Sequence, residues 1–401
     1  MANLNQTPSS ERVHIGFFGR RNAGKSSVVN AVTSQELSVV SDVLGTTTDP
    51  VKKAMELLPI GPVVIIDTPG FDDEGDLGKL RIQKTKQILG KTDIAVLVVD
   101  VTLGKNDFDK QLIAIFEDKE SPYIVAYNKS DLKNDIELSE NEILVSAKDN
   151  TNIKNLLEKI GQLAKTTNAT DRKICSDLLE EDDFVVLVTP IDESAPKGRM
   201  ILPQVQTIRD VLDKNCTCIV VKETQLESTL KQLGKKPKLV ITDSQVFGFV
   251  KTKVPLDIPL TSFSILFARF KGFLTTAVKG AKTLETLQNG DKVLISEGCT
   301  HHRQCNDIGT VKMPCWIENY SKSKPDFTFT SGTEFPENPE EFKLIIHCGG
   351  CMLNEKEMQS RINRATAKNV PIVNYSIAIA HMNGILRRSV EIFPDILKLL
   401  D

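Results

Sequence analysis

Short apolar runs alternate with longer amphipathic segments from residue 13 to about residue 165. Runs rich in β-branched residues predict strands, and the periodic stretches between them predict helices. The predicted strands are VHIGFFG, VVIID, IAVLVVD, YIVAYN and EILVSA. Each run is followed by Gly, Asp, Asn or Ser. This order is typical of a mostly parallel sheet with crossover helices, in which ligands bind at the carboxyl ends of the strands.

Two further α/β segments follow the first. Residues 166 to about 183 combine small polar residues with an acidic run and predict a linker. FVVLVTP, CTCIVVK and KLVITD then predict the strands of a small unit, and VLISEG, KLIIHCGGC and VPIVNYS those of another. Because 401 residues exceed the size at which a single core stops growing, we expect three α/β domains, at residues 1–170, 171–265 and 266–401.

The charge balance narrows the class of partner. The chain carries 50 Lys and Arg against 53 Asp and Glu, a formal net charge of −3, which argues against a surface built for nucleic-acid phosphates. With 5% aromatic residues there is little to stack on bases. No stretch reaches the roughly 20 apolar residues of a membrane span, and no signal-peptide core is evident. We expect a soluble cytoplasmic protein with no nucleic-acid or membrane partner.

A phosphate-binding loop lies directly after the first predicted strand. Residues 19–26 read GRRNAGKS, which matches G-x-x-x-x-G-K-S between a strand and a helix. Such a loop turns backbone N–H groups toward phosphates, while Lys25 places a positive charge beside the β- and γ-phosphates. The hydroxyl of Ser26 is a predicted magnesium ligand. The candidate residues of this loop are Asn22, Ala23, Gly24, Lys25, Ser26 and Ser27.

A second motif, DTPG at residues 67–70, ends the strand VVIID. The carboxylate of Asp67 can hold the magnesium shell, and the N–H of Gly70 can sense the γ-phosphate.

Two later motifs predict which base the bound nucleotide carries. In NKSD, residues 128–131, the carboxylate of Asp131 can accept the N1 and N2 protons of guanine, whereas adenine presents the opposite pattern at that edge. Asn128 and Lys129 belong to the same motif. The segment Ser146-Ala147-Lys148 would close the base pocket through backbone N–H groups. The nucleotide is therefore predicted to be GTP rather than ATP.

With these motifs the N-terminal part resembles the translation-factor-related GTPases. GTTTDP at residues 45–50 is similar to their first switch loop, in which a threonine completes magnesium coordination. The resemblance favours Thr47, with Thr46 as the alternative. The predicted catalytic residues are Lys25, Thr47, Asp67 and Gly70.

Phe71 follows DTPG, where Ras-like enzymes place a glutamine that orients water, so charge near the leaving group must come from elsewhere. In the related GTPases an asparagine at the position of Asn22 coordinates potassium through its side-chain oxygen, and carbonyls around residues 44–47 complete the shell. We expect potassium to accelerate GTP hydrolysis more than sodium does. The alternative is that Asn22 only caps the loop through hydrogen bonds.

The eight cysteines are unevenly distributed along the chain, since residues 1–174 contain none. A large cytosolic protein does not need disulfides, so clustered cysteines are better interpreted as metal ligands. Cys299-Thr300-His301 and Cys348-Gly349-Gly350-Cys351 each follow a predicted strand, and we expect these strands to be neighbours whose ends meet at one edge. Spacing alone leaves zinc and an iron–sulfur cluster equally open.

The GTPase motifs combined with GCTHHRQCNDIG, IIHCGGCM and the terminal segment resemble the maturation GTPases of FeFe-hydrogenases over the whole chain. The resemblance implies a 4Fe-4S cluster on Cys299, Cys348 and Cys351, with a fourth iron site that is open or exchangeably ligated; His301 is a candidate there. It also implies a homodimer through the middle domain, with radical-SAM maturases and apo FeFe-hydrogenase as partners. The implied function is a GTP-controlled scaffold that delivers a two-iron precursor.

The remaining features receive structural interpretations. Cys216 and Cys218 are predicted core residues, and Cys175 falls in the linker without a role. His347 flanks a ligand and is interpreted as structural, while FPENPEEF at 335–342 is interpreted as a solvated loop. The alternative function is a ribosome-assembly or tRNA-modifying GTPase with a zinc-stabilised C-terminal appendage.

Overall fold

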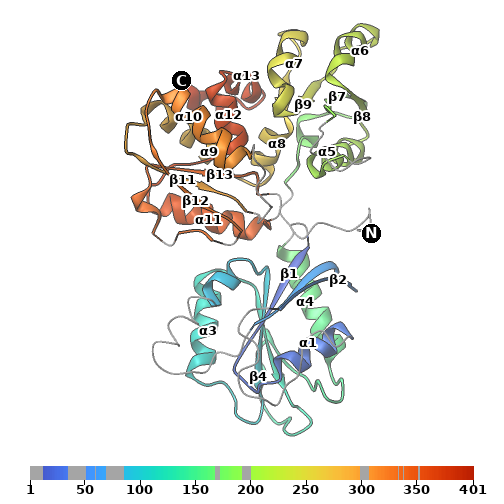
Figure 1. Cartoon of the computed structure of the whole chain (residues 1–401). Helices are drawn as coiled ribbons and strands as arrows, with labels where there is room; N and C mark the ends of the chain where they lie inside the picture. Colours follow the sequence, from blue (N-terminus) through green and yellow to red (C-terminus); the bar gives the residue numbers. More distant parts are fainter. Residues whose placement is uncertain are drawn as a thin grey trace. The chain divides into compact units, whose positions relative to one another are not determined.

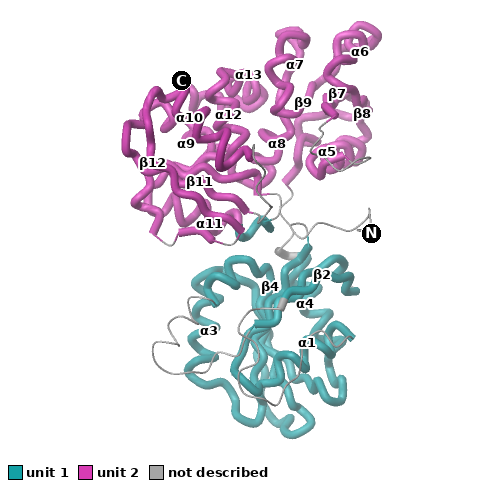
Figure 2. Tube along the Cα trace, viewed as in Figure 1, with its two compact units in different colours: residues 1–170, 352–357 teal, residues 171–351, 358–401 magenta. Residues whose placement is uncertain are grey.

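The computed structural model describes residues 12–34, 51–58, 60–68, 85–167, 172–191, 200–298, 307–332, 334–336, 338–350 and 353–401. The chain divides into two compact units (Figure 2). Unit 1 comprises Met1–Thr170 with Met352–Glu357, and unit 2 comprises Asp171–Cys351 with Met358–Asp401. Unit 1 contains one sheet and unit 2 contains two (Figure 1). The boundaries of three separate domains stay a prediction.

Unit 1 is built on a six-stranded sheet in the order β2-β3-β1-β4-β5-β6. Its strands are β1 (Val13–Phe18), β2 (Val51–Leu57), β3 (Gly61–Asp67), β4 (Ile94–Asp100), β5 (Tyr123–Asn128) and β6 (Glu142–Leu144). All of these strands pair in parallel except β2, which runs antiparallel to β3. The five predicted strands and the mostly parallel sheet are confirmed.

The two faces of this sheet bury separate apolar clusters. Along β4 every residue is buried, and successive side chains alternate between the faces, as the pleat of a strand requires. Val96 and Val98 belong to a cluster with residues of α1 (Lys25–Thr33) and α4 (Ile153–Thr167), whereas Leu97 and Val99 pack with residues of α3 (Asp107–Asp118). A strand covered on both faces reads as a continuous apolar run, which explains IAVLVV.

Unit 2 contains two four-stranded sheets whose paired strands are all parallel. The first has the order β10-β9-β7-β8 and the second β12-β11-β13-β14. The strands are β7 (Phe184–Val188), β8 (Thr217–Val221), β9 (Leu239–Thr242), β10 (Leu260–Ser262), β11 (Lys292–Ser296), β12 (Asp326–Thr330), β13 (Leu344–His347) and β14 (Ile372–Asn374). The α/β fold class is thereby confirmed in all three sheets.

The described helices of unit 2 are α5 (Leu202–Asp213), α6 (Leu226–Gln232), α7 (Phe247–Lys253), α8 (Phe263–Phe270), α9 (Leu274–Ala281), α10 (Met313–Ser321), α12 (Tyr375–Met382), α13 (Leu386–Val390) and α14 (Pro394–Leu397), together with α11 (Glu355–Ala367) from Met358 onward. Helices α5 and α6 lie between successive parallel strands, α5 between β7 and β8 and α6 between β8 and β9. Within the described residues, no helix has both the length and the apolar character of a membrane span.

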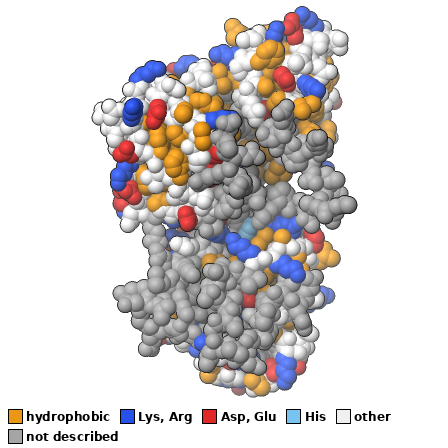
Figure 3. Space-filling model, viewed as in Figure 1, with side chains coloured by type: hydrophobic (Ala, Val, Ile, Leu, Met, Phe, Trp, Pro, Cys, Tyr) orange, Lys and Arg blue, Asp and Glu red, His pale blue; other side chains and the backbone are white. Residues whose placement is uncertain are grey.

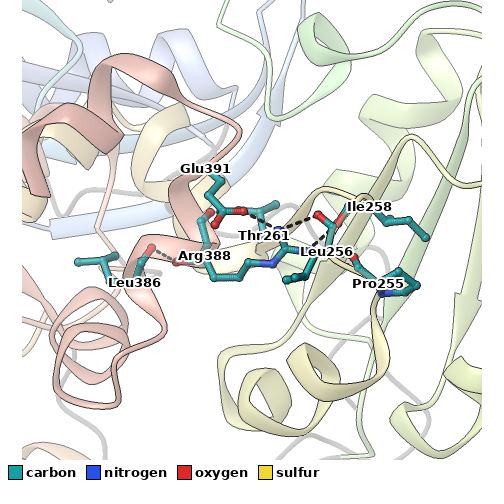
Figure 4. A network of polar contacts seen from close by, with 8 residues as sticks. Pro255, Leu256, Ile258, Thr261, Leu386, Arg388 and Glu391 are labelled. Carbon is teal, nitrogen blue, oxygen red and sulfur yellow. Dashed lines mark hydrogen bonds and ion pairs between the residues drawn. The ribbon is translucent and has the colours of Figure 1, made fainter. Parts of the chain in front are cut away.

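A buried arginine links a C-terminal helix of unit 2 to the segment before β10 (Figure 4). Arg388 on α13 is 8% exposed, and its guanidinium donates to the backbone carbonyls of Pro255, Leu256 and Ile258 at 3.2, 3.4 and 2.9 Å. It also contacts Glu391 at 2.5 Å. A guanidinium can satisfy several carbonyls at once because it has five donors in one plane. The segment that leads into β10 is thus held by the C-terminal helices.

The linker prediction is wrong for residues 172–183. Cys175 is fully buried, and its N–H and that of Ser176 each donate to Asp210 on α5 at 2.8 Å. Burial and the neighbouring carboxylate of Asp210 raise the pKa of the Cys175 thiol far above its ordinary value. This segment therefore packs as part of unit 2, and the thiol stays protonated.

Candidate functional site

The loop between β1 and α1 depends on two glycines. Gly19 has a φ of 141°, and a Cβ there would lie 2.3 Å from the Val98 carbonyl oxygen. Gly24 has a φ of 84°, and a Cβ there would lie 2.2 Å from the Asn128 side-chain nitrogen. Only glycine fits both positions. The loop therefore leads directly into α1, whose first residue is the buried Lys25, and it presents backbone N–H groups at a helix N-terminus.

Ser26 and Asp67 meet at the predicted magnesium position. The Ser26 hydroxyl donates to Asp67 Oδ2 at 2.9 Å, across 41 positions in the sequence. Asp67 is 7% exposed, and its Oδ1 has no hydrogen-bond partner among the residues that the structure describes. A buried carboxylate oxygen without a partner is costly, and a hydrated magnesium ion would satisfy it. The residues present fit magnesium.

Asn128 ties the phosphate loop to the base-recognition loops. Its Nδ2 donates to the Ala23 carbonyl at 3.1 Å, and its Oδ1 accepts the Ala147 N–H at 3.1 Å. The side chain is 3% exposed, so both hydrogen bonds are shielded from water. Asn128 is therefore a structural link between the two halves of the nucleotide site.

The carboxylate that would select guanine is held in place by its neighbours. The hydroxyl of Ser146, which is 1% exposed, donates to Asp131 Oδ1 at 3.0 Å. Lys148 Nζ lies 3.8 Å from Asp131 Oδ2. A carboxylate fixed by a buried hydroxyl is oriented before the ligand arrives, which lowers the entropy cost of binding.

Lys129 follows β5 with a left-handed backbone, at a φ of 67°, and reaches across to the end of β4. Its Nζ lies 2.5 Å from Asp100 Oδ2. Burial alone would raise the pKa of Asp100, but hydrogen bonds from Lys129 and Thr102 outweigh it and lower that pKa below its ordinary value. The ion pair joins the carboxyl ends of two adjacent strands.

Arg20 is a member of the site that the sequence reasoning missed. Its Nε lies 3.1 Å from Asp109 Oδ2, and its Nη2 donates to the Gly104 carbonyl at 2.8 Å. Asp109 is fully buried and also forms the capping box of α3 with Asn106. The spacing of Asn106 and Asp109 in the sequence is a recognisable helix-start signal. The pairing of Asp109 with Arg20, in contrast, depends on tertiary packing.

Asn22 is exposed with a φ of 61°, and its side chain makes no hydrogen bond to another described residue. Ser27 lies in the first turn of α1. Thr46, Thr47 and Gly70 lie outside the described residues, so the first switch loop and the γ-phosphate sensor stay predictions.

The two cysteine motifs follow neighbouring strands, as expected: β11 pairs with β13, and Ser296 lies opposite His347. Cys348 Sγ accepts the N–H of Gly298 at 3.0 Å and that of Gly350 at 3.4 Å. Backbone donors aimed at sulfur favour the thiolate, which is the form that binds metal. This donor environment fits a soft metal centre, whether zinc or iron–sulfur.

Cys299, His301 and Cys351 lie outside the described residues. Among the residues that the structure does describe, no three His, Cys, Asp or Glu side chains form a group that could hold a metal ion. The three-cysteine ligand set therefore stays a prediction.

His347 is structural, as interpreted from the sequence. It is fully buried, with Nδ1 2.8 Å from the Cys348 carbonyl and Nε2 3.0 Å from Arg361 Nη1. Burial and the charge of Arg361 lower the pKa of His347 to about 3. The solvated-loop interpretation is wrong at Phe335, which is 9% exposed and packs its ring 6.4 Å from the His347 ring.

The other cysteines divide by exposure. Cys216 is a core residue, 5% exposed, as predicted. The same prediction is wrong for Cys218 on β8, which is only half-buried; burial raises the pKa of its thiol to about 11. Cys315 is exposed on α10.

The strand order and these loops are those of a P-loop GTPase domain. The family model described as 50S ribosome-binding GTPase matches residues 14–129. Two further models, the Hydrogen maturase F dimerization domain and the Hydrogen maturase F tetramerization domain, match residues 174–272 and 275–392. The chain therefore belongs to the hydrogen maturase F family, in which a GTPase domain is joined to these two domains. The resemblance to hydrogenase maturation GTPases is confirmed.

Curated relatives share a part of the chain. The tRNA modification GTPase MnmE of Streptococcus gordonii is 34% identical over 157 residues, which are 38% of this chain and 34% of that protein. The GTPase Der of Wolinella succinogenes is 38% identical over 133 residues, 32% of this chain and 28% of that protein. The chain thus spans about a third of the length of these relatives. Among solved structures, a probable GTP-binding protein EngB is 24% identical, covering 38% of this chain and 100% of its own, with a TM-score of 0.32.

Proposed function

We propose that this protein is a GTP-hydrolysing scaffold that holds a 4Fe-4S cluster on Cys299, Cys348 and Cys351 and delivers a two-iron precursor to apo FeFe-hydrogenase. One observation carries the cluster assignment: the Gly298 N–H donates to Cys348 Sγ at 3.0 Å, across 50 positions in the sequence. Because Gly298 directly precedes Cys299, this hydrogen bond brings the two cysteine motifs together. The family membership supports the maturation role.

In the GTPase domain, the side chains of the nucleotide motifs bind and position the nucleotide. Lys25 and the backbone of the loop hold the β- and γ-phosphates, Ser26 and Asp67 hold magnesium, and Asp131 selects guanine. Thr47 and Gly70 would respond to the γ-phosphate, so hydrolysis to GDP and phosphate releases the switch loops. GTP thereby acts as a switch on contacts with partners, which include radical-SAM maturases.

We propose that potassium supplies the positive charge near the leaving group that an arginine finger provides in other GTPases. Asn22 is exposed in a left-handed conformation, with no hydrogen bond from its side chain to the described residues. This supports a ligand role over the capping alternative, because a capping asparagine would hydrogen-bond to backbone N–H groups of its own loop.

The cluster, when bound, supplies a site at which a precursor can bridge to iron without displacing a cysteine. The chain contributes the thiolates, the N–H donors of Gly298 and Gly350, and an exchangeable position for which His301 is the candidate ligand. Loading and release then need no covalent change in the protein.

Oligomerisation is indicated by the two matched domains. Strand β8 is an edge of its sheet, and Val220 on it is 43% exposed, so we propose that β8 pairs across a two-fold axis in a homodimer. On the face drawn in Figure 3, hydrophobic side chains of unit 2 lie exposed in several groups among charged ones. Such groups are typical of protein–protein contact surfaces.

The cluster assignment is tested by anaerobic reconstitution followed by iron and sulfide analysis and electron paramagnetic resonance of the reduced protein. The wild type should bind about four iron atoms per chain and give the signal of a reduced 4Fe-4S cluster. Cys348→Ala should lose the iron while GTP hydrolysis persists. The matched control is Cys315→Ala, since Cys315 is an exposed cysteine on α10. A colourless zinc protein, or unchanged iron in Cys348→Ala, would refute the assignment.

A further inference from the structure

A buried arginine lies behind the cysteine loop. Arg361 on α11 is 1% exposed, its Nη1 lies 3.0 Å from His347 Nε2, and its Nη2 donates to the Gly332 carbonyl at 2.7 Å. Its guanidinium carbon lies 5.4 Å from the centroid of the Phe335 ring. Burial of a charged group is expensive unless hydrogen bonds and aromatic faces compensate it. Arg361 is nevertheless buried, and the residue it contacts, His347, directly precedes the candidate metal ligand Cys348. This arrangement suggests that the guanidinium acts on the cysteine loop.

The direction of the hydrogen bonds follows from arginine chemistry. A guanidinium has donors only, so Nε2 of His347 must accept from Arg361, and the imidazole hydrogen must be on Nδ1. That Nδ1–H donates to the carbonyl of Cys348 at 2.8 Å. His347 therefore connects the guanidinium to the backbone of the cysteine.

Other contacts hold the same loop. The Cys348 N–H donates to the Ser296 carbonyl at 2.9 Å, which continues the β11–β13 ladder by one residue. Gly350 has a φ of 63°, and a Cβ there would lie 2.6 Å from the sulfur of Met358. Met358 and Arg361 are three residues apart and share one face of α11. This helix face thus supports both Cys348 and Gly350, the two residues that set where the sulfur and one of its N–H donors lie.

We propose that Arg361, acting through His347, is a positioning residue of the cysteine loop and a permanent positive charge for the metal centre. This inference rests on the proposed 4Fe-4S site. Reduction makes a cluster more negative, and a nearby cation in a water-excluded site stabilises that state. Arg361 should therefore raise the reduction potential of the cluster, and it should also restrict the motion of the loop before any metal is bound.

The first experiment uses the full-length apoprotein. Amide hydrogen exchange by mass spectrometry is followed in peptides that cover residues 344–350, for the wild type, Arg361→Met and Arg361→Lys. The matched control is Arg364→Met, because Arg364 lies on the same helix with its guanidinium carbon 5.3 Å from the same Phe335 ring but is half-buried. Exchange should be faster in both Arg361 variants, since neither can make the two guanidinium hydrogen bonds, and unchanged in the control.

The second experiment uses reconstituted protein and separates charge from positioning. Arg361→Met should keep its iron but titrate at a lower reduction potential with altered g-values. Arg361→Lys keeps the charge and should stay closer to the wild-type potential, and Arg364→Met should match the wild type. If Arg361→Met does not fold by circular dichroism, Arg361→Lys carries the test through its faster exchange.

The outcomes are distinguishable from those that test the proposed function. Wild-type exchange and wild-type potential in both Arg361 variants would overturn the inference. A wild-type protein that binds no iron would refute the 4Fe-4S site and with it the charge role, whereas faster exchange in the variants would still support the positioning of the loop.

Discussion

Asp131→Asn is the sharpest test of the nucleotide site. The wild-type carboxylate can accept two protons from guanine, and hydrogen bonds to a charged group contribute about 1.5–3 kcal/mol each. In the variant, the amide oxygen can still accept one proton, but the amide N–H would face a guanine N–H. We expect the loss of one such bond plus that unpaired contact to weaken GTP binding by about 3 kcal/mol or more, which is roughly 150-fold in Kd.

The structure indicates that Asp131→Asn should weaken GTP binding without unfolding the loop that contains it. The amide of the variant would keep an oxygen to accept from the Ser146 hydroxyl, which donates to Asp131 Oδ1 at 3.0 Å in the wild type, so the loop should stay folded. Competition against a fluorescent guanine nucleotide measures the Kd. Xanthosine triphosphate is the informative competitor, because its C2 oxygen can accept from the new amide, and the variant should prefer it to GTP.

The control is Asp149→Asn, since Asp149 is exposed in the same part of the chain and lies 3.5 Å from the Ser146 hydroxyl. It should change GTP affinity by about twofold or less, as is usual for surface substitutions. Wild-type GTP affinity in Asp131→Asn, or no gain for xanthosine triphosphate, would show that Asp131 does not read the base.

Three further predictions follow from the chain. Turnover measured in matched potassium, sodium and choline chloride should be fastest in potassium and lose that preference in Asn22→Ala; equal rates in the wild type would exclude the cation. Val220→Lys on β8 should lower the sedimenting mass at micromolar concentration, whereas Leu58→Lys, a control in unit 1 that is 83% exposed, should not; an unchanged mass would exclude β8 as the interface. Because the folded pKa of Asp100 is lowered, its carboxylate stabilises the fold above the unfolded pKa and loses that effect as pH falls through the folded value. Asp100→Asn should therefore be less stable than the wild type in denaturant melts at pH 7, with a deficit that shrinks in acid; a deficit constant with pH would contradict the Lys129 pairing.

Place in the sheet explains only part of what the sequence predicts, since the edge strands β6, β8 and β14 are predicted along with the central strands. Central strands such as β4 are covered on both faces and give unbroken apolar runs. The missed strands β2, β10 and β12 are each at an edge of their sheet. Lys52 and Lys53 are exposed on β2, and three of the five residues of β12 are exposed, because an edge strand has fewer neighbours to pack against. The apolar signal of β2 and β12 is correspondingly weak, whereas β10 is buried throughout but is only three residues long.

The nucleotide motifs could be predicted because each is local, a few residues at the end of a strand. The groups that hold those motifs in place could not. Arg20 pairs with Asp109, and His347 with Arg361, through contacts between separate elements. Asp210 holds the segment around Cys175 in the same way. Such partnerships are set by tertiary packing, so charge and spacing along the chain do not indicate them.

The contacts of Arg388 bear on how this protein can be dissected. The two maturase family models divide the chain between residues 272 and 275, yet the guanidinium lies on one side of that division and its three carbonyl acceptors, Pro255, Leu256 and Ile258, lie on the other. A fragment limited to either family segment would separate the guanidinium from those acceptors and expose to water a surface that is buried in the whole chain. The boundary between the two family segments is therefore not a boundary between two independent interiors, and we expect either segment alone to be less stable than it is in the whole chain.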